Sequence, residues 1–183
     1  TFFRAADGTG HFYGHAKKSA EIAEELLIRL RADSVSREKV VFLVARHDLS
    51  LPSDEILLKK RLRRFGEENI RDLFVIQRAD ASALAEPGKK LKELDAAEAV
   101  FEKILEEEQC FSLRNLKITG NDLKAYISPG PEMGRLLSFL LDSVIEGTCE
   151  NKKDALLCEA QRWFQKQKRY IGESSMEKSD GME

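Results

Sequence analysis

Apolar residues recur every three or four positions in successive segments of this chain. That spacing lets a helix bury one face, whereas a half-buried strand needs strict alternation. In residues 15–31 the stripe contains Ala16, Ala20, Ala23, Leu27 and Leu30. Similar stripes occupy residues 36–48, 67–84 and 91–109, and a strongly basic helix is expected over 53–66. We therefore predict an all-α fold whose helices pack against one another.

Residues with specific backbone preferences predict where these helices begin and end. Ser36 is expected to cap the second helix, and Pro52 with Ser53 to start the third, which ends near Gly66. Before the first helix, residues 1–14 place aromatic residues on both sides of Asp7-Gly8-Thr9-Gly10, which predicts a loop or hairpin.

After Cys110 the segments become shorter and richer in turn residues, so we place a domain boundary there. Thr119 is expected to cap a short helix, Pro131 to begin a longer one that Gly147 ends, and Asn151 to cap the last. The expected organisation is a helical domain over 1–110, a smaller helical subdomain over 111–170 and a flexible tail over 171–183.

The composition is typical of a soluble, helix-rich protein, with 42% hydrophobic and 34% charged residues. No apolar run approaches the roughly 20 residues that a membrane span needs. The cysteines are three, widely spaced, and include no CxxC pair, so we interpret them as reduced structural thiols. These features predict a cytoplasmic protein without a membrane partner.

The net charge of −2 conceals two basic segments. One contains Lys59, Lys60, Arg61, Arg63 and Arg64 without an acidic residue between them. The other, residues 151–170, has six basic residues against two acidic ones, and its later cations are Arg162, Lys166, Lys168 and Arg169. Each segment fits a nucleic-acid surface or, equally well, a solvated helix face.

Three ionisable residues fall on helix faces that should be buried. His15 and His47 continue apolar stripes, and Asp80 lies seven positions after Leu73 on the expected inner face of its helix. A carboxylate is costly to bury alone, so two imidazoles and a carboxylate could together bind a divalent metal. Hydrogen-bonded core residues are the alternative interpretation. His11 is expected to have a packing or solvent role instead.

Four phrases of the sequence carry a family resemblance. They are HFYGHAKKSAEIAEELL (11–27), VVFLVARHDL (40–49), RADASALAE (78–86) and the region LKITGNDL to KKDALL (116–157). In this order they resemble the helical regions of bacterial CCA-adding tRNA nucleotidyltransferases and poly(A) polymerases that carry an HD-type domain. The resemblance implies a multi-helix HD-like bundle, of which 1–110 would be a part, followed by a smaller helical subdomain.

The resemblance also implies roles for individual residues. In HD-type domains the positions of His15, His47 and Asp80 are metal-site residues, for magnesium or a transition metal. The remaining ligands would lie upstream of Thr1, so we expect at most half a metal site here. The family's transfer chemistry uses an N-terminal domain with a Gly-Ser motif and paired aspartates, and ATP or CTP would bind there rather than to these 183 residues.

For the helical region, the resemblance implies binding of tRNA or another structured RNA. The basic residues named above are the candidates, because phosphate contacts from Lys and Arg supply affinity without reading sequence. Two rival hypotheses remain open. The chain could be an HD-type metal-dependent phosphohydrolase acting on nucleotides or phosphodiesters, or a non-enzymatic interaction module in which His15, His47 and Asp80 are core polar residues.

Overall fold

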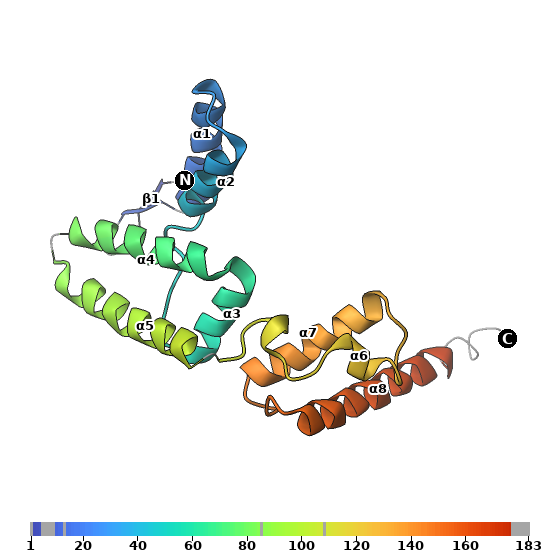
Figure 1. The fold of residues 1–183 in the computed structure, drawn as a ribbon. Coiled ribbons are helices and arrows are strands. Elements are labelled where there is room, and N and C mark those ends of the chain that lie inside the picture. The colour runs from blue at the N-terminus through green and yellow to red at the C-terminus, as the bar shows by residue number, and fades with distance from the viewer. Residues whose placement is uncertain (1, 5–9, 13, 85, 108, 177–183) are drawn as a thin grey trace. The chain divides into compact units, whose positions relative to one another are not determined.

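The computed structural model is built from helices that follow a short β hairpin (Figure 1). It describes residues 2–4, 10–12, 14–84, 86–107 and 109–176, with side chains from 14 to 166 in those ranges. Strands β1 (Phe2–Arg4) and β2 (Gly10–Phe12) pair antiparallel, with Phe3 opposite His11. The prediction of an all-α fold is confirmed. The paired strands agree with the extended pieces of the predicted loop or hairpin, whose turn residues Asp7-Gly8-Thr9 lie outside the described chain.

Contacts along the chain divide it into two compact units, Thr1–Glu102 (unit 1) and Lys103–Glu183 (unit 2). The helices that begin in unit 1 are α1 (His15–Arg29), α2 (Ser34–Val44), α3 (Glu55–Phe65), α4 (Glu67–Ser82) and α5 (Gly88–Glu106). Unit 2 contains η1 (Leu113–Asn115), α6 (Gly120–Leu123), α7 (Pro131–Ile145) and α8 (Lys153–Met176). The domain boundary after Cys110 stays a prediction.

Aspartates, and not the serines predicted from sequence, cap α2 and α3. The Asp33 carboxylate accepts the backbone N–H of Ser36 at 2.9 Å, so Ser36 lies inside α2. Asp54 accepts the N–H of Leu57 at 2.7 Å, and α3 therefore begins at Glu55 rather than at Ser53. An aspartate accepts an amide proton of the first turn and also places negative charge at the positive end of the helix dipole.

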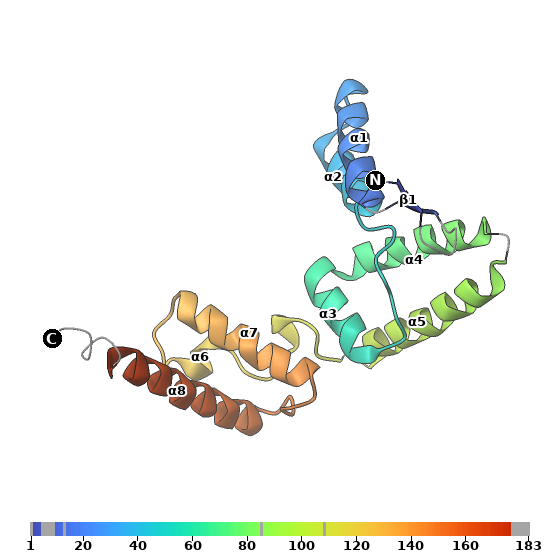
Figure 2. The same cartoon turned by 180° about the vertical axis from the view of Figure 1, so that it is seen from behind.

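In unit 1, α4 and α5 run side by side, as both ribbon views show (Figures 1 and 2). The rings of Phe74 and Phe101 meet edge to face between them at 5.5 Å, and both side chains are buried. Ion pairs flank this contact, because Arg71 bonds Glu102 on α5 and Arg78 bonds two further carboxylates of α5, Asp95 and Glu98. Apolar burial thus joins the two helices, and the charges fix their alignment.

Helix α3 joins α4 through one residue, Gly66, which ends the first helix and precedes the second. Its φ of +80° lies in the region that side chains disfavour. Leu58 and Leu62 are the buried residues of α3, and they lie one turn apart on one face. Because these two leucines take the buried face, the basic residues of α3 lie on the remaining faces of the helix.

Helices α1 and α2 pack against each other but bury little. Ala16 and Ala20 are the buried residues of α1, and α2 has none in the described chain. The predicted stripe is wrong at its end, since Leu30 is 76% exposed. Leu30 follows the last residue of α1, where the chain turns toward α2, and so it leaves the packed face.

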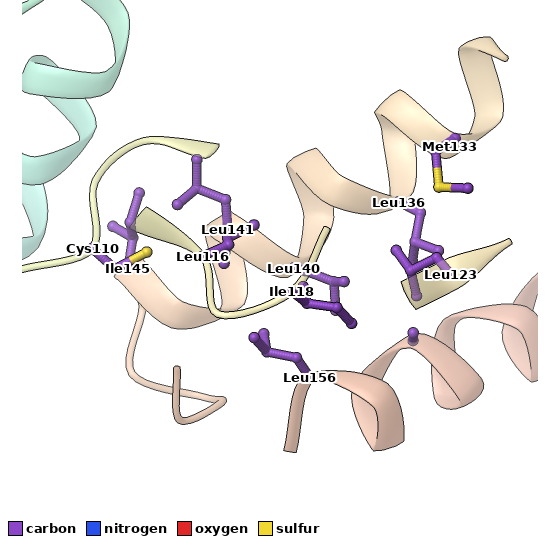
Figure 3. Packing of buried hydrophobic residues seen from close by; sticks show 11 residues of the cluster. Cys110, Leu116, Ile118, Leu123, Met133, Leu136, Leu140, Leu141, Ile145 and Leu156 are labelled. Carbon is purple, nitrogen blue, oxygen red and sulfur yellow. The ribbon is translucent and has the colours of Figure 1, made fainter. Parts of the chain in front are cut away.

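In unit 2, α7 supplies the centre of the core (Figure 3). Leu136 and Leu140 from α7 pack with Leu123 of α6 and Leu156 of α8, and all four are fully buried. Pro131 is the first residue of α7, Gly147 follows its end with φ +73°, and Thr119 precedes α6, so these three predicted boundaries are confirmed.

Asn151 does not cap the last helix. Its side chain accepts the backbone N–H of Lys117 at 2.9 Å and donates to the carbonyl oxygen of Asn115 at 2.8 Å, so it joins two loops of unit 2. Helix α8 begins at Lys153 and continues to Met176, into the predicted tail of 171–183. A single glycine, Gly172, weakens a helix by roughly 1 kcal/mol without ending it. Residues 177–183 lie outside the described chain.

No helix in the described ranges combines the length and the apolar content that a membrane crossing requires.

Candidate metal and nucleic-acid sites

His15 and His47 meet in unit 1, but the prediction that both are buried is wrong, because His15 is exposed and His47 is half-buried. His15 is the first residue of α1, His47 lies in the turn after α2, and their Nε2 atoms are 3.0 Å apart. The Nδ1 atom of His47 lies 2.8 Å from the carbonyl oxygen of Val44. Because a carbonyl can only accept, Nδ1 carries a proton, and a neutral His47 then presents the lone pair of Nε2 to His15. Such a backbone contact also orients histidines that bind metals.

Asp80 borders the same region without being buried. It lines a hollow of about 590 Å³ together with His47, Ser19 and the apolar residues Leu43, Val44 and Ile76. The expectation that Asp80 lies on the inner face of α4 is wrong, because its side chain is exposed. The buried face of α4 contains Phe74, Gln77 and Ala81, and Asp80 lies at its edge.

The described residues do not by themselves assemble a complete metal centre. Among them, no group of three or more His, Cys, Asp or Glu side chains is close enough to hold an ion. Histidine nitrogens at this separation can share one cation, but a stable site needs further ligands. A metal site formed by His15, His47 and Asp80 stays a prediction, and no chemical step is derived from it.

Helix α3 presents most of its predicted cations on or near the surface. Lys60 and Arg64 are exposed, and Arg61 and Arg63 are half-buried. Lys59 differs, because its side chain is only 13% exposed and its Nζ lies 2.7 Å from the carboxylate of Glu55 one turn earlier. Lys59 is therefore the member of this run least able to contact a nucleic acid.

The second basic segment lies in unit 2 and is partly neutralised. Lys153 bonds Asp122 at 2.5 Å, and Arg162 bonds Glu159 at 3.1 Å. Lys166 is exposed, whereas the side chains of Lys168 and Arg169 lie outside the described residues. Trp163 and Phe164 on the same helix pack against the core of unit 2, with ring centroids 5.3 Å apart, which favours a packing role for them.

Sequence reasoning missed one cation, Arg46. It lies in the turn after α2, and its guanidinium carbon is 4.4 Å from the centre of the Phe42 ring. Arg46 is the single Lys or Arg in the mostly apolar phrase 40–49, so no basic run marks it. The only signal in the sequence is its spacing from Phe42, four positions earlier, which brings the two onto one side of a helix.

Most of the chain matches one protein family. The family described as "tRNA nucleotidyltransferase domain 2 putative" matches residues 13–160, which include α1 to α7 and the first turns of α8. The chain belongs to the tRNA nucleotidyltransferase family. The family resemblance seen in the four sequence phrases is thereby confirmed.

Two curated tRNA nucleotidyltransferases match most of the chain. An A-adding enzyme from Deinococcus radiodurans is 28% identical over 168 residues, which is 89% of this chain and 38% of the relative. A CC-adding enzyme from Thermus thermophilus is 34% identical over 153 residues, which is 81% of this chain and 33% of the relative. The chain thus spans about a third of the length of these tRNA nucleotidyltransferases. No solved structure gives a significant match.

Proposed function

We propose that this chain is the RNA-binding helical region of a tRNA nucleotidyltransferase, and that it holds tRNA during processing of the 3′ end. The observation that carries this proposal is the family match, which extends over most of both units. The two relatives are named for adding different nucleotides, yet the same stretch of this chain resembles both. A region shared by enzymes with different products is suited to holding their common substrate.

The cations of α3 support this role. Lys60 and Arg64 are exposed on one side of the helix, and Leu58 and Leu62 anchor the other side in unit 1. A rigid helix keeps such charges at fixed positions, and Lys and Arg contacts to phosphates supply most of the affinity of proteins for nucleic acids. Folded RNA is recognised mainly by shape, so a binding surface of this kind needs no base-reading motif.

A phosphohydrolase is not the favoured alternative. The matched family and both curated relatives are nucleotidyltransferases. The transferase chemistry itself is assigned, in this proposal, to polypeptide that corresponds to the rest of the relatives' length. Magnesium and the incoming ATP or CTP would bind there.

Competition binding tests the proposal. Fluorescently labelled tRNA is bound to the full chain and displaced with unlabelled tRNA, with an unstructured RNA of equal length, or with a DNA duplex of equal charge. We expect tRNA to displace the label at the lowest concentration, since shape and 2′-hydroxyl groups distinguish it from the other two. Equal displacement by all three competitors would contradict a role in holding tRNA.

A further inference from the structure

Two arginines of unit 1 lie against the same aromatic ring. The guanidinium carbon of Arg46 is 5.3 Å from the centre of the Phe65 ring, and that of Arg64 is 5.2 Å from the same centre. Phe65 also meets Phe42 edge to face at 5.6 Å. The turn after α2 and the last turn of α3 therefore bring two positive charges together. These four residues are named the Arg46–Arg64 cluster.

The charges of this cluster are not neutralised by the described part of the chain. Neither Arg46 nor Arg64 forms an ion pair there, whereas Arg71 and Arg78 on α4 each bond two carboxylates. Contact with a ring attracts a guanidinium only weakly at an exposed site and leaves its charge in place. Two like charges that contact the same ring raise the positive potential around it, which favours an anion.

Acidic residues of α1 lie beside Arg46. Arg46 borders a hollow with Lys17, Glu21 and Glu24, and Glu21 is already bonded to Lys18 at 3.0 Å. These carboxylates reduce the positive potential toward α1.

The ring contacts also determine which anion fits. A guanidinium that lies over a ring keeps its N–H groups directed outward in the plane, where they match two oxygens of one phosphate. Arg61 lies one turn before Phe65 on α3 and likewise has no ion pair in the described chain. Neighbouring phosphates along a nucleic-acid backbone present such oxygens in series.

We propose that the Arg46–Arg64 cluster, together with Arg61, binds backbone phosphates of a structured RNA. This inference rests on the proposed function and extends it to Arg46, a residue outside the basic run of α3. In this site the two guanidinium groups donate hydrogen bonds to phosphate oxygens. The packed rings of Phe42 and Phe65 hold the two groups in place.

A pair of matched double variants tests the site. R46Q with R64Q removes two charges from the cluster, and R29Q with R31Q removes two charges from the end of α1 and the turn after it, where both arginines are exposed. We expect the first variant to bind tRNA about tenfold more weakly and to reduce the slope of log K against log salt by about two. The second variant should bind like the unaltered chain. Circular dichroism checks that both are folded.

Chemical modification of the arginines in the unaltered chain tests the site even if the cluster variant does not fold. Phenylglyoxal modifies accessible guanidinium groups, and mass spectrometry locates the modified residues. We expect tRNA to protect Arg46 and Arg64 from modification and to leave Arg29 and Arg31 reactive. Equal reactivity of Arg46 and Arg64 with and without tRNA would overturn the inference.

The outcomes separate this inference from the proposed function. If the chain binds tRNA with salt-dependent affinity, but the two double variants behave alike, the phosphate site is wrong and the proposed function stands. If the unaltered chain does not bind tRNA at low salt, the proposed function fails, and the site fails with it.

Discussion

The Nε2 atoms of His15 and His47 lie 3.0 Å apart although 32 positions separate the two residues. The contact joins the start of α1 to the turn after α2. The carbonyl oxygen of Val44 fixes the ring of His47 from the other side. Two imidazoles in this arrangement either share a hydrogen bond or offer two ligands to a cation.

His15 and His47 offer only two clustered metal ligands, so the chain should bind divalent transition metals weakly. We expect Co²⁺ to produce weak visible absorbance changes during a titration, and a desalting step to remove the metal. His47→Ala should abolish the change, whereas Asp48→Asn, at the adjacent exposed position, should preserve it. Tight stoichiometric metal together with phosphodiester hydrolysis would contradict this account and favour an HD-type phosphohydrolase.

Gln77 should contribute to the stability of unit 1 through one buried hydrogen bond. Its side-chain amide donates to the carbonyl oxygen of Leu49 at 2.6 Å, and the residue is only 7% exposed. Gln77→Leu fills a similar volume but leaves that carbonyl unpaired, so the free energy of unfolding should fall by about 1–3 kcal/mol. Urea denaturation measures the change. Val75→Ala on the exposed side of α4 is the control and should have little effect.

Asp122 should make unit 2 sensitive to acid. Its carboxylate accepts from Lys153 and from the hydroxyl and backbone N–H of Thr119, and these bonds lower its pKa well below the ordinary value of 3.8. A lowered pKa means that the stabilisation is present above pH 3.8 and is lost as the pH falls below it toward the folded-state pKa.

The comparison of wild type with Asp122→Asn measures this effect. The difference in melting temperature should be largest above pH 3.8 and should shrink as the pH falls below that value. Asp154→Asn, at an exposed position of α8, serves as the control and should show a smaller dependence. A difference that grows on acidification would contradict the assignment of Asp122 as a carboxylate held in its charged form.

Shortening a buried side chain of α7 should destabilise unit 2 more than shortening an exposed side chain of the same unit. Leu140 is fully buried among side chains of α6, α7 and α8 (Figure 3). Leu140→Ala leaves a cavity and should lower the free energy of unfolding by about 2–5 kcal/mol. Leu113→Ala is the control, because Leu113 is 50% exposed and its truncation removes little buried area. Equal losses in the two variants, measured by urea unfolding, would show that α7 is not the centre of the core.

Much of the fold was predictable because helical periodicity and turn chemistry are local signals. The stripe of α7 with Leu136 and Leu140, the start at Pro131 and the end at Gly147 follow from neighbouring residues alone. The caps of α2 and α3 were assigned to the wrong residues, because Asp33, Ser36, Ser53 and Asp54 all favour caps and local preference does not rank them.

The candidate sites were less predictable, since they depend on contacts between distant segments. Helical spacing places His15 and His47 on inward stripes but cannot show that their nitrogens meet. The same spacing put Asp80 on a buried face, although a change of one position around a helix carries a side chain to its edge. Arg46 escaped notice because its neighbours Phe65 and Arg64 come from another helix.

The affinity of the full chain for tRNA as a function of salt concentration tests the central claim most directly. We expect tight binding at low salt and a linear fall of log K with log salt, with a shallower slope after Lys60, Arg61, Arg63 and Arg64 are replaced by Ala. Lys59→Ala should change little, because Glu55 already neutralises that lysine. No binding at low salt, or an affinity that salt leaves unchanged, would contradict a cationic helical surface for tRNA.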